Sequence, residues 1–441
     1  MDLSPDAVAI IGFLVLFGLM LLRVPVGMAM GLVGVSGYAY IAGPGPALKL
    51  IGQSSMRTVT DYTFGVIPMF MLMGAFVSVS GVSKELFRAA NAFIGHLRGG
   101  LGVATVLACG GFAAICGSSV ATAATITGVA LPEMKRHGYS GRLSTGTLAA
   151  GGTLGILIPP SVPLVIYAIL TEQNIAKLFA AAMVPGIVAM LGYMIAIAIY
   201  VRVVPGHAPE VDDDVSHLTW GSIKGVAPIM AIFVIVFGGI YSGMFTPTEG
   251  AAVGAASTFI ASLFKGEITW EKFKQCFYAT ADSSAMIFLI FIGADLMNGA
   301  LALSQASTQL SALVMGLGWS PIMVVVGILL FYVVLGAVMD ELSMILLTIP
   351  IFFPIVIGMD FGMPKESVAI WFGILVLMVV EFGLLAPPVG LNVYVVNGMA
   401  KDIPIAESYR GVMPFLISDT LRTLLILFFP GICLWLVSVI T

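Results

Sequence analysis

The sequence predicts an all-α polytopic membrane protein made of two inverted repeats, each with a re-entrant hairpin and a broken helix. Of its 441 residues, 59% are hydrophobic and only 10% are charged, whereas soluble domains carry about 25% charged residues. Apolar runs without period-two alternation recur along the whole chain, which favours helices over strands. A Gly-x-x-x-Pro-Pro motif also occurs once in each half, at 155–160 and 383–388.

A bilayer core about 30 Å thick requires roughly 20 apolar residues per crossing helix. Apolar stretches of this kind predict crossing helices near 6–22, 26–42, 63–81, 143–158, 183–202, 226–244, 248–264, 284–303, 367–385 and 411–438. Two short polar stretches, Ala47–Thr60 and Trp270–Ala281, each follow a pair of crossing helices. We expect them to form arms along the membrane surface.

Two further apolar stretches, 100–132 and 320–358, are too long for one crossing. Each is interrupted near its middle, the first at Gly117-Ser118-Ser119 and the second between Gly336 and Glu341. They are predicted to enter the membrane, turn, and leave on the same side. Irregular backbone at such a tip is tolerated only where protein or a watery cavity surrounds it.

The two halves resemble each other beyond the proline motifs, since Gly117 and Gly336 occupy matching positions. Each half has three crossings, a hairpin and two more crossings. Five crossings is an odd number, so the second half is inverted relative to the first. Inverted repeats with discontinuous helices at matching positions are typical of secondary transporters, whose site lies near the midplane.

The distribution of basic residues predicts the orientation. If both termini lie outside and neither hairpin crosses, most of the 19 lysines and arginines fall on the inner side. The acidic connection Gly206–His217, which includes Asp212, Asp213 and Asp214, then joins the halves on that side and is expected to be a solvated linker.

Serine hydroxyls and free carbonyl groups are hard oxygen donors that suit Na⁺, so the tip at Gly117–Ser119 is a candidate cation site, with small-residue packing as the alternative. Paired prolines should unwind a helix and free carbonyls near Gly155 and Gly383. Asp340 is the preferred acidic candidate because carboxylates inside a membrane are costly. Glu381 and Asp295 are weaker candidates, which could instead partner a buried hydroxyl or a neighbouring subunit.

Several other functions are disfavoured. The net charge of −4 gives no basic footprint for nucleic acid. The four cysteines form no CxxC pair and the four histidines are not clustered, so no zinc site is suggested. No serine or cysteine has a histidine nearby in a coherent motif. The chain is therefore not expected to be an enzyme.

Three long motifs resemble the large membrane subunit of tripartite ATP-independent periplasmic (TRAP) transporters. They are Gly117-Ser-Ser-Val-Ala-Thr-Ala-Ala-Thr-Ile-Thr-Gly128, Leu131-Pro-Glu-Met-Lys-Arg-His-Gly-Tyr139 and Ala149-Ala-Gly-Gly-Thr-Leu-Gly-Ile-Leu-Ile-Pro-Pro-Ser161. Pro247-Thr-Glu-Gly-Ala251 and Ala386-Pro-Pro-Val-Gly-Leu-Asn392 fit as well. The likeness spans essentially the whole chain.

The resemblance implies Na⁺-coupled import of an organic acid across the bacterial inner membrane, with both termini periplasmic. It implies two partners: a small membrane subunit of about four helices as a separate chain, and a periplasmic substrate-binding protein. The implied sodium-site residues are Gly117, Ser118, Ser119, Gly155, Gly336, Asp340, Gly383 and Pro387. The expected substrate-site residues are Ser118, Thr122, Thr153, Pro160 and Asn392.

Family members move their hairpins and broken helices against a fixed scaffold, as an elevator. On that basis we expect scaffold and arm at 1–82 and 226–304, and transport-domain halves at 83–182 and 305–410. A connecting helix and inner loop at 183–225 and a C-terminal helix at 411–441 complete the division. The halves would contain the hairpins 100–132 and 320–358 and the broken helices 143–170 and 367–399.

Two alternatives remain open at this point. A stand-alone sodium/dicarboxylate symporter of related architecture needs no binding protein. A membrane scaffold that does not transport predicts no solute flux and leaves the paired helix breaks unexplained.

Overall fold

The computed structural model describes residues 4–209, 220–337 and 339–440. Their regular structure is helical throughout, with no strand among them. Six helical stretches of this described part are long and apolar enough to cross a membrane, and further apolar helices have 10–17 residues. The chain is therefore a multi-pass membrane protein. The predicted linker residues Asp212, Asp213 and Asp214 fall outside the described ranges.

The helices follow one another in two series of matching order. The first series is α1 (Pro5–Leu21), α2 (Val26–Ala42), α3 (Pro44–Thr60), η1 (Tyr62–Gly65), α4 (Val66–Val79), α5 (Val82–Ile94), α6 (Gly100–Cys116), α7 (Ser119–Arg136), α8 (Gly141–Leu157), α9 (Val162–Thr171) and α10 (Ile175–Val203). The second series is α11 (Trp220–Tyr241), α12 (Pro247–Phe264), α13 (Trp270–Ser304), α14 (Ala306–Gly316), α15 (Pro321–Gly336), α16 (Glu341–Ile357), α17 (Lys365–Gly383), α18 (Leu391–Met399), α19 (Ile405–Phe428) and α20 (Gly431–Ile440).

Both predicted hairpins are present. Gly117 ends α6 in the left-handed conformation (φ 67°), and the Ser118 hydroxyl accepts a hydrogen bond from the Ala121 amide at the start of α7. In the second hairpin, α15 ends at Gly336 and the Asp340 carboxylate accepts from the Ser343 amide at the start of α16. Small or capping residues therefore reverse the chain in the middle of each apolar stretch.

Both predicted helix breaks are also present. The proline pairs Pro159-Pro160 and Pro387-Pro388 separate α8 from α9 and α17 from α18, and both bonds are cis. Ser161 then caps α9, since its hydroxyl accepts from the Leu164 amide. Proline cannot donate to a helical ladder, which explains why the helices stop at these points.

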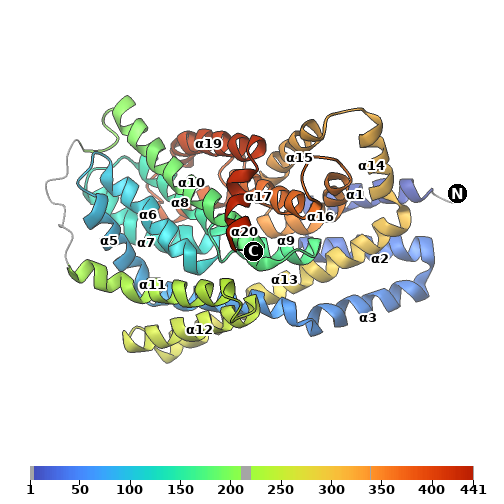
Figure 1. Ribbon diagram of the computed structural model, residues 1–441, viewed down its shortest axis with the longest axis horizontal. Coiled ribbons are helices and arrows are strands. Elements are labelled where there is room, and N and C mark those ends of the chain that lie inside the picture. The colour runs from blue at the N-terminus through green and yellow to red at the C-terminus, as the bar shows by residue number, and fades with distance from the viewer. Residues whose placement is uncertain (1–3, 210–219, 338, 441) are drawn as a thin grey trace.

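The two repeats pack across each other. Helix α2 lies against α13 and the equivalent α12 lies against α4, while α7 contacts α18 and the equivalent α16 contacts α9. Figure 1 shows the two hairpins toward opposite ends of the long axis, with α17 and α9 between them, and α3, α11 and α12 along the lower edge. Broken helices from both halves thus meet at the centre of the molecule.

Two helix assignments from the sequence were wrong. The stretch 411–438 is not one helix, because Pro430 separates α19 from α20. The predicted arm Trp270–Ala281 continues without interruption into the crossing helix, so that α13 has 35 residues. Helices α5 and α14 were not foreseen. The division into scaffold and transport domains stays a prediction.

Helices α2 and α13 pack at backbone contact distance through glycines. A β-carbon on Gly34 would lie 2.4 Å from the Met297 amide nitrogen, whereas one on Gly18 of α1 would meet no atom within 4 Å. We therefore expect Gly34→Ala to destabilise the protein by about 1–3 kcal/mol, the usual cost of overpacking. Gly18→Ala should be neutral or stabilising. Thermal unfolding of the two purified variants tests this, and equal melting temperatures would contradict the close packing.

Candidate transport site

A cavity of about 380 Å³ lies where the first hairpin tip meets the start of α16 and helices α4 and α13. Helix α9 also reaches it, through Val162. Polar groups on its wall include Ser78, Ser118, Gln275, Thr280 and Glu341. The cavity is large enough for a small organic molecule, and it lies beside both irregular segments of the first repeat.

The first hairpin tip packs directly on the first helix break. A β-carbon on Gly117 would lie 2.6 Å from the Pro160 carbonyl oxygen, and one on Gly155 would lie 2.5 Å from the Ser118 carbonyl oxygen. The predicted residues Gly117, Ser118, Gly155 and Pro160 therefore lie together. Close packing brings backbone carbonyl oxygens of the tip and the break near the cavity.

The second tip and break repeat this arrangement. A β-carbon on Gly383 would lie 2.7 Å from the Gly336 α-carbon, so only glycines fit at this contact. The Asn392 amide donates to the Leu384 carbonyl oxygen across the break (3.2 Å). Pro387 lies in the exposed part of the same break. Gly336, Gly383 and Pro387 thus belong to one region, and their role as sodium ligands stays a prediction.

The two hairpins meet through side chains. The Ser119 hydroxyl donates to Glu341 Oε2 at 3.0 Å, and Ser119 is fully buried. The sequence favoured Asp340 over Glu341, but Asp340 uses one carboxylate oxygen to cap α16, while Glu341 lines the cavity. Asp340 and Glu341 are both at the second hairpin tip, and sequence position alone does not show which of these two adjacent residues faces the cavity.

Four predicted substrate residues, Thr122, Thr153, Pro160 and Asn392, are not among the residues that line the cavity. The Thr122 hydroxyl donates to the Ser118 carbonyl oxygen (2.7 Å) and supports the tip from behind. Asn392 is buried against α8, where its Nδ2 lies 3.4 Å from the Ala149 carbonyl oxygen. Its Oδ1 has no hydrogen-bond partner within the described part of the chain. Thr153 belongs to a different group of residues.

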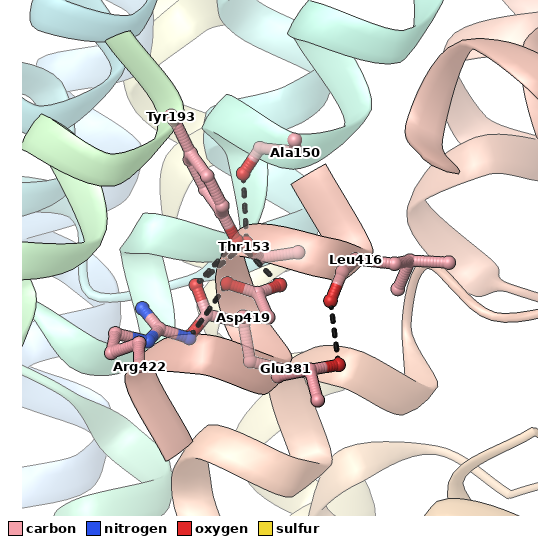
Figure 2. A network of polar contacts seen from close by, with 8 residues as sticks. Ala150, Thr153, Tyr193, Glu381, Leu416, Asp419 and Arg422 are labelled. Atoms are coloured by element: carbon pink, nitrogen blue, oxygen red, sulfur yellow. Dashed lines mark hydrogen bonds and ion pairs between the residues drawn. The ribbon is translucent and has the colours of Figure 1, made fainter. Parts of the chain in front are cut away.

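That group is a buried ionic network on four helices (Figure 2). Arg422 Nη2 lies 2.7 Å from Glu381 Oε2 and 2.9 Å from Asp419 Oδ1. Tyr193 donates to Asp419 Oδ2 (2.8 Å), and Thr153 Oγ1 lies 2.7 Å from Glu381 Oε1. Glu381 thus partners a buried hydroxyl and a cation. The sequence signal for the missed members was the Asp419/Arg422 pair at i, i+3 in a membrane helix.

Asp295 has a simpler environment, because the Ser54 hydroxyl donates to its carboxylate at 2.6 Å. It therefore also partners a hydroxyl. Outside the membrane-spanning segments, Lys135 and Asp402 form an ion pair of 2.5 Å that links the end of α7 to the connection after α18. The hydrogen bond from Lys135 holds the pKa of the Asp402 carboxyl below its usual range.

The family model described as "Tripartite ATP-independent periplasmic transporter, DctM component" matches residues 13–432. The C4-dicarboxylate TRAP transporter large permease protein of Pseudomonas aeruginosa is 35% identical over 88% of this chain and 89% of its own length. Its namesake from Rhodobacter capsulatus is 32% identical over 97% and 98%.

The isethionate TRAP transporter permease protein DctMQ of Oleidesulfovibrio alaskensis is 30% identical over 94% of this chain but only 64% of its own length. Among solved structures, the Alcanivorax borkumensis YdaH transporter resembles the fold with a TM-score of 0.58 at 13% identity. That match covers 85% of this chain and 87% of the transporter.

Proposed function

Since this chain belongs to the DctM component family of the tripartite ATP-independent periplasmic transporters, we propose that it imports a small organic acid by coupling to Na⁺. The solute would be delivered by a periplasmic substrate-binding protein and moved inward by an elevator displacement of the hairpins and broken helices. A separate small membrane subunit would complete the permease. The cavity between the first tip, the start of α16, α4 and α13 is the observation that carries this proposal.

The chemistry of the cavity supports a cation as a co-ligand of an anionic solute. Glu341 is the charged side chain on its described wall, and that wall includes no lysine, arginine or histidine. A carboxylate placed there would need positive charge from elsewhere. The N-terminal ends of α7, α9 and α16 can supply partial positive charge, and Na⁺ held by hydroxyl and carbonyl oxygens can supply a full one.

The structure offers hard oxygen donors for such an ion. The carbonyl oxygens of Ser118 and Pro160 lie where the first tip contacts the first break, and the Gly336 carbonyl oxygen lies at the contact with Gly383 in the second. Ser119 and Asp340 add side-chain oxygens. Sodium would order the tips first and so favour anion binding, and by reciprocity the anion would tighten sodium binding equally.

The predicted orientation places the cavity on the inner side of the membrane. It lies beside Ser78 near the end of α4 and Gln275 near the start of α13. Lys84, which follows α4, and Lys272 and Lys274, at the start of α13, are among the basic residues that this orientation assigns to the inner side. Gly74 of α4 also packs on the first tip, because a β-carbon there would lie 2.7 Å from the Cys116 carbonyl oxygen. The proposed inner-membrane location, with both termini periplasmic, agrees with an inward-facing arrangement.

The test is uptake into proteoliposomes that contain this chain, the small subunit and the external binding protein. Thermal-shift screening of the binding protein against dicarboxylates, sugar acids and keto acids first identifies the solute. A sodium gradient should then drive uptake. Full uptake with a proton gradient and no sodium would reject the coupling, and uptake by this chain alone would favour a stand-alone symporter. No flux in the complete system would reject transport.

Two substitutions test the proposed ion ligands. Ser119→Ala and Asp340→Ala should each raise the sodium concentration for half-maximal uptake by about threefold to tenfold, because each removes a hard oxygen worth about 1 kcal/mol. Ser320→Ala is the matched control: Ser320 caps α15 as Asp340 caps α16, but at the far end of that hairpin helix. An unchanged sodium dependence in either test variant would remove that residue from the site.

A further inference from the structure

The buried network joins four helices at one level of the molecule. Thr153 belongs to α8, Tyr193 to α10, Glu381 to α17, and Asp419 and Arg422 to α19. Each side chain is at most 4% exposed, and the four helices contact one another in every pairwise combination. Figure 2 shows their polar groups converging on a common centre.

Two members occupy equivalent positions in the two repeats. Thr153 precedes Gly155 by two residues, and Glu381 precedes Gly383 by two residues. The contact between Thr153 Oγ1 and Glu381 Oε1 at 2.7 Å therefore joins the broken helices directly, just ahead of both breaks. The remaining members come from α10 and α19, which are also equivalent in the two series.

Arg422 contacts carboxylates on two helices, α17 and α19. A single nitrogen, Nη2, contacts Glu381 Oε2 and Asp419 Oδ1, while Nε and Nη1 have no hydrogen-bond partner among the described residues. A shift of α17 relative to α19 would therefore lengthen contacts to the same nitrogen. At membrane depth such contacts are not readily replaced by water.

Two ion pairs join the same four helices at the ends that lie away from the breaks. Arg142 of α8 pairs with Glu407 of α19 at 2.8 Å, and Lys177 of α10 pairs with Glu366 of α17 at 2.6 Å. Both pairs lie at helix N-termini, far along the helices from the breaks. They can hold the bundle together, but they do not connect one break to the other.

We propose that the Thr153–Glu381–Arg422 contact is the link through which the two helix breaks fix each other's position. Thr153 and Glu381 are then positioning residues that act on both halves of the transport site without touching the solute. A substitution at Thr153, in the first broken helix, should therefore weaken the backbone hydrogen bonds at the second break, which is more than 200 residues further along the chain. The importance of this link for uptake rests on the proposed function, whereas the link itself does not.

Hydrogen exchange of backbone amides tests the link without sodium or solute. The complete permease in lipid nanodiscs is compared as wild type, Thr153→Val and Thr153→Ser. Thr153→Val keeps the side-chain shape but removes the hydroxyl. It removes the contact with Glu381 Oε1 and also one with the Ala150 carbonyl oxygen, at 2.7 Å within α8. It should speed exchange about threefold to tenfold at the second break, where the Leu385, Ala386 and Asn392 amides donate, as expected for losing a buried hydrogen bond between the two helices. Thr153→Ser should restore slow exchange.

Thr145→Val is the matched control on the same helix. Thr145 is also fully buried, but its hydroxyl donates only locally, to the Gly141 carbonyl oxygen at 2.8 Å. It should leave the second break unchanged. Normal exchange there in Thr153→Val would overturn the proposal, and so would equal acceleration in Thr145→Val, since that would reflect general loosening. If exchange behaves as expected but sodium does not drive uptake, the proposed coupling fails and the link stands.

Discussion

Gly117→Ala is expected to lower solute uptake by at least about tenfold while the protein still reaches the membrane. The added β-carbon would lie 2.6 Å from the Pro160 carbonyl oxygen, closer than packed atoms can approach. The left-handed conformation at φ 67° adds about 1–2 kcal/mol for any residue with a β-carbon. Tip and break must therefore separate, which would disturb the backbone oxygens beside the cavity.

Gly138→Ala distinguishes the effect of the close contact with Pro160 from the effect of the left-handed backbone conformation. Gly138 has a similar left-handed conformation, with φ 74°, but a β-carbon there would meet no atom within 4 Å. It should keep most of the uptake. Initial rates in proteoliposomes, normalised to the amount of reconstituted protein, give the comparison. Equal rates for the two variants would mean that the contact between the first tip and the first break is not required for transport.

The sequence predicted the interruptions of the fold well because each has a local cause. Gly117 and the proline pairs at 159–160 and 387–388 each stand shortly after the last turn of a helix and account for its end. Continuity was harder to predict. The polar residues 270–281 suggested a separate arm, yet nothing in them stops a helix and α13 runs through them. Conversely, Pro430 divides a stretch that hydrophobicity alone joins into one helix.

The candidate site could be predicted only in part, because only some of its residues have a local cause in the sequence. Residues at the tips and breaks could be named because irregular backbone marks them. Partners from distant segments could not, since Ser119 meets Glu341 and Thr153 meets Glu381 only after both repeats have folded. Helix periodicity does not determine which of Asp340 and Glu341 faces the cavity. Long-range pairing of polar groups in a membrane depends on packing that one sequence does not reveal.

The buried network gives the second large effect, which concerns stability. Arg422→Met should destabilise the folded protein by about 3–5 kcal/mol, the usual cost of removing one partner from a buried ion pair. Glu381 and Asp419 are at most 1% exposed and would be left without their cation. We expect a large fall in the melting temperature of the purified permease.

Removing the charges together should reverse most of that loss. The triple variant Glu381→Gln, Asp419→Asn, Arg422→Met removes all three charges of the network, and its amide oxygens can still accept from Thr153 and Tyr193. Buried ion pairs replaced as a set are often nearly neutral for stability, so the triple variant should melt well above Arg422→Met. Arg410→Met is the control, because the Arg410 side chain is 65% exposed beside Glu407 on the same helix and such pairs contribute little. If the triple variant were as unstable as Arg422→Met, the destabilisation would come from lost packing by the arginine and not from unpaired carboxylates.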